Sequence, residues 1–151
     1  MPVRAEASGT ERGAGPGEEG RLREVARNSK ASWGYDDERV RAWADSLNYA
    51  GKDVHVAVGD GAIVGYATLV VEGDRAELDE LWIDPAWMGK GVGAEVFRFV
   101  AARAAGLGAS RLEWESDPNA VGFYERMGAR YLRDSPPSEW GRILPVMGID
   151  L

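Results

Sequence analysis

The sequence contains no cysteine and a single histidine, His55, among its 151 residues. The lack of cysteine excludes disulfides and a thiol nucleophile. A Ser-His-Asp triad would have to be built on His55. A metal site made of several histidines is excluded, so we expect no metal. No segment approaches the apolar length that crosses a membrane, so we expect no membrane partner.

Basic residues are also scarce, with 18 Lys and Arg against 25 Asp and Glu and a formal net charge of -7. Nucleic-acid binding requires a basic face, so nucleic acid is not an expected partner. A cationic substrate is compatible with this charge. The first twenty residues have no apolar run typical of a signal peptide, and we expect a cytoplasmic location.

The hydrophobic pattern predicts one domain over residues 1–151, with a flexible glycine-rich loop at 9–20 inside its first twenty residues. Asp60-Gly61 and Gly73-Asp74 are typical of hairpin turns. The expected elements are a short strand at 2–7, helices over 21–32 and after the capping residue Asp36, an antiparallel meander over 54–83, a helix over 92–105, a strand over 111–116, a short helix over 117–127 and final strands at 129–133 and 143–151.

Three glycines at alternate positions, Gly89, Gly91 and Gly93, lead into the helix predicted over 92–105 in the stretch "PAWMGKGVGAEVF". Glycine is a poor helix former, so its repetition here needs a reason. One hypothesis is tight packing of the loop. A second is a dinucleotide fingerprint, because Gly89-x-Gly91-x-x-Ala94 matches G-x-G-x-x-G/A. A Rossmann strand, however, runs directly into its first glycine, and here a loop intervenes.

The third hypothesis is a pyrophosphate cradle at the helix N-terminus. The N–H groups of a first helical turn have no intrahelical acceptor and lie at the positive end of the helix dipole. Glycines let a diphosphate approach these N–H groups, and Lys90 adds positive charge.

Two segments together resemble the GNAT superfamily of acetyl-CoA-dependent N-acetyltransferases. The family motif Gln/Arg-x-x-Gly-x-Gly/Ala is similar to "LWIDPAWMGKGVGAEVF", with Gly91 and Gly93 in the glycine places. A second motif, a strand and then a short helix with Asn and Phe-Tyr before Gly, is similar to "LEWESDPNAVGFYERMGAR". Met88 departs from the pattern, because the family usually has Gln or Arg there. The resemblance covers residues 54–151 well.

The resemblance implies an α+β fold of the three-layer GNAT type. Its sheet is expected to be mixed, mostly antiparallel and splayed, with about six to seven strands and about four helices. Acetyl-CoA is then the implied co-substrate and an amine, on a small molecule or a peptide, the implied acceptor. The residues that the resemblance assigns to coenzyme A are Leu81, Trp82, Ile83, Met88, Gly89, Lys90, Gly91, Val92, Gly93, Asn119 and Tyr124.

Direct attack of the amine on the thioester needs two proton transfers. The resemblance places Tyr124 where the family has the acid that protonates the leaving thiolate, and a tyrosine is protonated at neutral pH. A core tyrosine is the alternative. Glu77 is the first candidate for the base and Glu80 the second. Being three apart on a strand, the two face opposite sides of a regular pleat.

Several further residues each have two possible roles. Asn119 either binds coenzyme A or stabilises a turn. Trp33 and Tyr35 either wall the acceptor pocket or pack on the surface, and Glu115 is expected on its acceptor side. The function predicted is acetyl transfer to a primary amine, and the alternative is a non-catalytic acyl-CoA-binding or regulatory protein of the same fold. A homodimer is compatible with either of these two functions.

Overall fold

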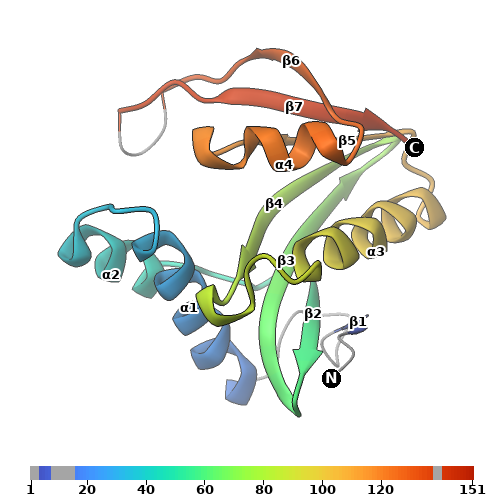
Figure 1. The fold of residues 1–151 in the computed structure, drawn as a ribbon. Coiled ribbons are helices and arrows are strands. Elements are labelled where there is room, and N and C mark those ends of the chain that lie inside the picture. Colours follow the sequence, from blue (N-terminus) through green and yellow to red (C-terminus); the bar gives the residue numbers. More distant parts are fainter. Residues whose placement is uncertain (1–3, 8–15, 138–140) are drawn as a thin grey trace. The chain divides into compact units, whose positions relative to one another are not determined.

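The computed structural model describes residues 4–7, 16–137 and 141–151 (Figure 1). The helices are α1 (Pro16–Ala31), α2 (Asp37–Asp45), α3 (Val92–Gly106) and α4 (Val121–Arg126), with 3-10 turns η1 (Pro85–Trp87) and η2 (Pro118–Ala120). The strands are β1 (Arg4–Ala7), β2 (Asp53–Gly59), β3 (Ala62–Glu72), β4 (Arg75–Ile83), β5 (Arg111–Glu115), β6 (Arg130–Asp134) and β7 (Pro145–Asp150).

The strand order is β1-β2-β3-β4-β5-β7-β6. β4 pairs with β5 in parallel, whereas β1 with β2, β2 with β3, β5 with β7 and β6 with β7 pair antiparallel. The predicted class, α+β with a mixed and mostly antiparallel sheet, is confirmed.

Local sequence explains how the meander forms. Asp60 and Gly61 have φ of 51° and 77°, and Gly73 has φ of 63°. Positive φ at the central residues is what a tight hairpin turn with the right twist requires, and Gly and Asp tolerate it. The predicted hairpin turns are therefore confirmed. Asp36 also caps α2 as predicted, accepting a hydrogen bond from the Arg39 N–H at 3.0 Å.

The described residues fall into two compact units. The first consists of those within Met1–Leu69 and Glu80–Val100, and the second of those within Val70–Asp79 and Ala101–Leu151. β3 and β4 contribute residues to both.

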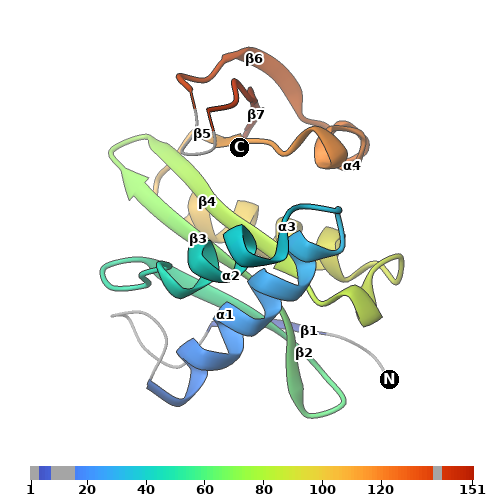
Figure 2. The same cartoon turned by 90° about the vertical axis from the view of Figure 1, so that its left-hand side faces the viewer.

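In the first unit, helices cover both faces of the strands. α1 and α2 lie on one side of β2, β3 and β4, and α3 begins on the other side (Figures 1 and 2). One buried cluster joins α1 to the sheet, and its members are Leu22, Val25, Ala26, Tyr49, Val54, Val56 and Tyr66. His55 is buried in β2 with its ring 5.3 Å from that of Phe99.

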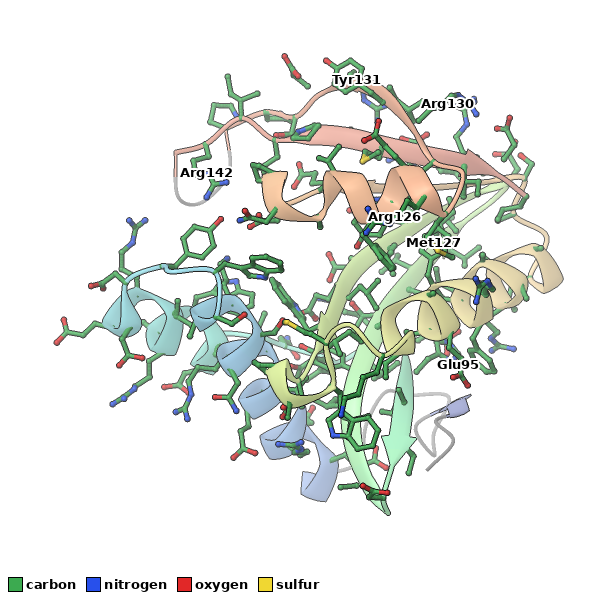
Figure 3. All side chains as sticks on the ribbon, viewed as in Figure 1. Glu95, Arg126, Met127, Arg130, Tyr131 and Arg142 are labelled. Atoms are coloured by element: carbon green, nitrogen blue, oxygen red, sulfur yellow. The ribbon has the colours of Figure 1, made fainter. Side chains whose placement is uncertain are left out.

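In the second unit, β5 lies between β4 and β7, with Arg75 of β4 opposite Arg111 and Met147 of β7 opposite Trp114. β6 is the last strand in the order. Figure 3 shows Arg130 and Tyr131 on the side of β6 away from α4. Tyr131 is 58% exposed.

The loop predicted over residues 9–20 is wrong at its C-terminal end, because α1 begins at Pro16. Proline is favoured in the first turn of a helix, and Glu18 and Glu19 are stabilised there by the helix dipole. These signals outweigh the poor helix propensity of the neighbouring glycines. Residues 9–15 lie outside the described part of the chain.

Candidate active site

The glycine loop runs from η1 into α3 within the first unit. Gly89 and Gly91 have φ of 76° and 83°, a conformation that glycine adopts without strain. The first hydrogen bond of α3 runs from the Glu95 N–H to the Gly91 carbonyl at 3.1 Å. The N–H groups of Val92, Gly93 and the following residue therefore have no acceptor inside the helix.

The two loop glycines have open space where a side chain would start. A Cβ placed on Gly89 or on Gly91 would meet no heavy atom within 4 Å. Neither glycine is therefore explained by tight packing against the protein, which was the first of the three hypotheses. Val92 is 1% exposed, so its side chain anchors the start of α3 in the core.

An ion pair holds the start of this loop to α1. Arg21 Nη2 lies 3.2 Å from Asp84 Oδ2, and Arg21 Nε donates to the Ile63 carbonyl at 2.9 Å. The other carboxylate oxygen of Asp84 caps η1 through the Ala86 N–H at 3.0 Å. Arg21 thus fixes the turn from which the glycine loop departs.

The rest of the turn is held by Trp87. Its ring packs on β2, where a Cβ at Gly59 would come within 2.7 Å of it. Lys90 Nζ lies 5.4 Å from the centre of the same ring. Met88 is half-buried and follows η1, with its N–H donating to the Pro85 carbonyl at 3.3 Å.

On β4, Glu77 is exposed and Glu80 is 8% exposed, so the predicted alternation of faces holds at these positions. Glu80 accepts hydrogen bonds from Tyr66 at 3.0 Å, from Thr68 at 3.4 Å and from the Trp82 indole at 3.3 Å. Burial, and then the Glu80 charge, raise the pKa of Tyr66 above its usual range. Leu81, Trp82 and Ile83 are half-buried.

Glu77 belongs to the second unit, in register with Glu113 of β5. Partial desolvation of its carboxyl group, followed by the neighbouring charge of Asp79, raises the pKa of Glu77. The charge of Arg75 opposes this shift, and that of Glu115 adds to it. A carboxylate with a raised pKa is a better proton acceptor near neutral pH.

Tyr124 is 7% exposed on α4, with its ring 4.7 Å from that of Trp114 and 5.0 Å from that of Phe123. Burial, and to a smaller extent the Asp117 charge, raise the pKa of Tyr124 above its usual range. The side chain is therefore packed like a core tyrosine and also stays protonated at neutral and moderately basic pH.

Asn119 lies in η2, where its side-chain amide and its backbone N–H both donate to Asp117 Oδ1 at 2.9 Å. These contacts support the turn role among the two alternatives for Asn119. Trp33 is 43% exposed in the turn after α1, whereas Tyr35 is half-buried and lies 5.6 Å from Lys30 Nζ.

Within the described residues, no group of three or more His, Asp or Glu side chains is arranged to hold a metal ion. None of the helices in this part of the chain is both long and apolar enough to cross a membrane.

The chain belongs to the acetyltransferase (GNAT) family, whose profile matches residues 21–129. The family predicted from the two motifs is thereby confirmed. An uncharacterised N-acetyltransferase of Mycobacterium tuberculosis is 35% identical over 91 residues, which cover 57% of this chain. The match spans 58% of that relative's length.

Solved structures share the fold over nearly the whole chain. A GCN5-related N-acetyltransferase from Rhodopseudomonas palustris has a TM-score of 0.78 and 20% identity, over 99% of this chain and 95% of its own. The PaiA N-acetyltransferase from Thermoplasma acidophilum, solved in complex with coenzyme A, has a TM-score of 0.76 and 17% identity, over the full length of both chains.

No local pattern in the sequence indicates the contacts of Arg21, Asp84 and Lys30. Arg21 and Asp84 are 63 positions apart, so their ion pair leaves no local pattern. In the sequence, Lys30 is only a basic residue in the last turn of α1, where the helix dipole favours a positive charge.

Proposed function

We propose that the protein transfers an acetyl group from acetyl-CoA to a primary amine. The observation that carries this proposal is the glycine loop of a GNAT family member, with open space at Gly89 and Gly91 where a Cβ would stand. Loop amides and the first turn of α3 hold the diphosphate of coenzyme A, and Lys90 adds charge. Met88 contributes no polar group.

Backbone groups of Leu81, Trp82 and Ile83 hydrogen-bond the pantetheine arm, which lies along the strand where the sheet is expected to splay. The side chains of these three residues take no part in those hydrogen bonds and can pack against the protein, which is consistent with their half-burial. Asn119 stabilises the η2 turn through Asp117 and contributes to the coenzyme site through the position of that turn.

Acetyl-CoA supplies the thioester, and the chain's own residues move the protons. Glu77 takes the proton of the incoming ammonium, which its raised pKa favours. Glu80 is the second candidate, but its carboxylate already accepts three hydrogen bonds. Tyr124 protonates the leaving thiolate, and its raised pKa means that the phenol is protonated when the thiolate forms.

Acidic side chains near Glu77 favour a positively charged acceptor. Asp79 and Glu115 act on Glu77 in one direction and Arg75 acts against them, so we expect a negative field at Glu77 that Arg75 reduces. Such a field attracts cations and weakens with added salt. Trp33 and Tyr35 remain candidates for the acceptor wall.

The test is release of free thiol from acetyl-CoA across polyamines, aminoglycosides, amino acids and basic peptides. We expect turnover with cationic amines and a KM that rises with ionic strength. Binding of coenzyme A without thiol release from any amine would favour the alternative, a non-catalytic acyl-CoA-binding protein.

A further inference from the structure

The ammonium of Lys30 lies over three aromatic rings of the first unit. Its Nζ is 4.1 Å from the ring centre of Trp43, 5.6 Å from that of Tyr35 and 5.9 Å from that of Trp82. A cation within about 6 Å of an aromatic face is attracted by the ring quadrupole, and tryptophan is the strongest partner. We call Tyr35, Trp43 and Trp82 the aromatic cage.

The cage is assembled from separate elements. Lys30 comes from the last turn of α1, Tyr35 from the turn before α2, Trp43 from α2 and Trp82 from β4. The two indoles meet edge to face, with ring centres 5.2 Å apart and planes at 72°. This contact sets the two tryptophan rings at a steep angle, so that both can border one cation.

A buried carboxylate strengthens the cage. The Trp82 indole N–H donates to Glu80 Oε1 at 3.3 Å. Donating to an anion increases the electron density of the indole ring, which strengthens its attraction for a cation. The negative charge of Glu80 also acts directly on any ammonium bound at Trp82.

The cage is accessible, because all three rings and Lys30 are half-buried rather than enclosed. Lysine carries its charge on a flexible four-carbon stem, so the ammonium can leave while α1 stays in place. The structure therefore contains a site that holds an alkylammonium group, together with a tethered occupant that a second cation could replace.

We propose that the aromatic cage binds a cationic group of the acceptor other than the amine that is acetylated, and that Lys30 occupies the cage until the acceptor displaces it. This inference rests on the proposed function and names its substrate class, acceptors that carry a second aliphatic ammonium group. Lys30 acts as an internal competitor, so weakly basic or anionic acceptors do not open the site.

The test titrates tetramethylammonium chloride, which cannot be acetylated, and follows tryptophan fluorescence without acetyl-CoA, using sodium chloride as the ionic control. A resident cation that fills the cage nine-tenths of the time lowers apparent affinity about tenfold. Lys30→Ala should therefore bind the probe roughly tenfold more tightly than the unmodified chain. Lys30→Arg should keep the weak binding, and Lys52→Ala, which removes a lysine outside the cage, should change nothing.

Replacing Trp43 in the Lys30→Ala background tests the cage itself. Trp43→Leu should abolish the gain, and Trp43→Phe, which keeps a weaker aromatic face, should retain part of it. Thermal melting identifies any variant that fails to fold. If Trp43→Leu fails to fold, Trp43→Phe takes its place as the test of the cage. If folded Lys30→Ala gains no affinity, the cage is a structural contact between α1 and α2 and the inference falls.

The two proposals fail in different ways. Tight probe binding by Lys30→Ala without thiol release from any amine would leave the cage as a cation site and overturn the acetyl transfer. Thiol release with an amine KM that Lys30→Ala and Trp43→Phe leave unchanged would keep the acetyl transfer and overturn the role of the cage.

Discussion

Arg21 on α1 and Asp84 before the glycine loop form an ion pair, with Nη2 and Oδ2 at 3.2 Å and side chains 30% and 17% exposed. The carboxylate of Asp84 also caps η1, so the pair links α1 to the turn that starts the loop. The position of the loop therefore depends on a residue far from it in sequence.

Arg21→Met should raise the KM for acetyl-CoA several-fold and leave the acceptor KM unchanged, because it loosens the loop and not the acceptor site. Charge-assisted hydrogen bonds contribute about 1.5–3 kcal/mol to stability, and less where solvent reaches the pair. The control is Arg41→Met, which removes an exposed pair with Asp37 at 3.3 Å and should cost under about 0.5 kcal/mol. Equal effects of both variants on acetyl-CoA would contradict the role of Arg21.

Coenzyme A should stabilise the fold and NAD should not. At a hundredfold excess over Kd, linkage gives about 2.7 kcal/mol. For a chain of this size that is a rise in Tm of about 5–10 °C. Differential scanning fluorimetry with each ligand measures it, and a shift with NAD alone would restore the dinucleotide hypothesis for the glycine loop.

Gly93→Ala should weaken coenzyme A binding at least tenfold without unfolding the protein. Gly93 lies in the first turn of α3, so an added methyl group would stand next to the amides proposed to hold the diphosphate. The matched control is Gly106→Ala at the other end of α3, where a Cβ meets nothing within 4 Å. Both changes raise helix propensity, so equal calorimetric Kd values for coenzyme A in the two variants would refute a diphosphate site at Gly93.

Tyr124→Phe should lower kcat by about 10²–10⁴-fold with little change in coenzyme A affinity, as loss of a general acid does. The phenyl ring preserves the contact with Trp114, so the fold should survive. Because burial raises the pKa of Tyr124, kcat of the unmodified enzyme should not fall from loss of this proton between pH 7 and about 10. Full activity of the Phe variant would return Tyr124 to a packing role.

Arg133→Met should destabilise the second unit by about 2–3 kcal/mol at pH 7, because it leaves the buried Glu113 with less compensation. Arg133 Nη2 lies 2.7 Å from Glu113 Oε1, and Arg111 Nη1 lies 3.4 Å from Oε2. Burial alone would raise the pKa of Glu113, but Arg133, Arg75 and Arg111 together outweigh it and lower the pKa.

The sign of the pH dependence follows from that lowered pKa. The stabilisation by Glu113 is present above its unfolded pKa of about 4.3 and is lost as pH falls through the folded value. Urea unfolding should therefore show a smaller effect of Arg133→Met below about pH 4 than at pH 7. Arg130→Met, which breaks an exposed pair with Asp150, is the control on β6 and should change stability little.

The sequence by itself determined the features that depend on local backbone geometry. Asp60-Gly61 predicts a hairpin because its residues must adopt positive φ, and Asp36 predicts a helix start because its carboxylate reaches an N–H three residues on. The glycine loop was recognisable for the same reason, and with the Phe123-Tyr124 segment it identified the family. Pro16 gave an equally local signal, but the neighbouring glycines obscured it.

Only the tertiary structure decided which side chains meet. The period of a strand separates Glu77 from Glu80, but burial of Glu80 depends on Tyr66 and Thr68 of β3. The Arg21–Asp84 pair and the cage around Lys30 join elements that are distant in sequence and leave no periodic pattern. Their energies depend on distances of a few ångströms and on exclusion of water, and those quantities exist only once the chain has folded.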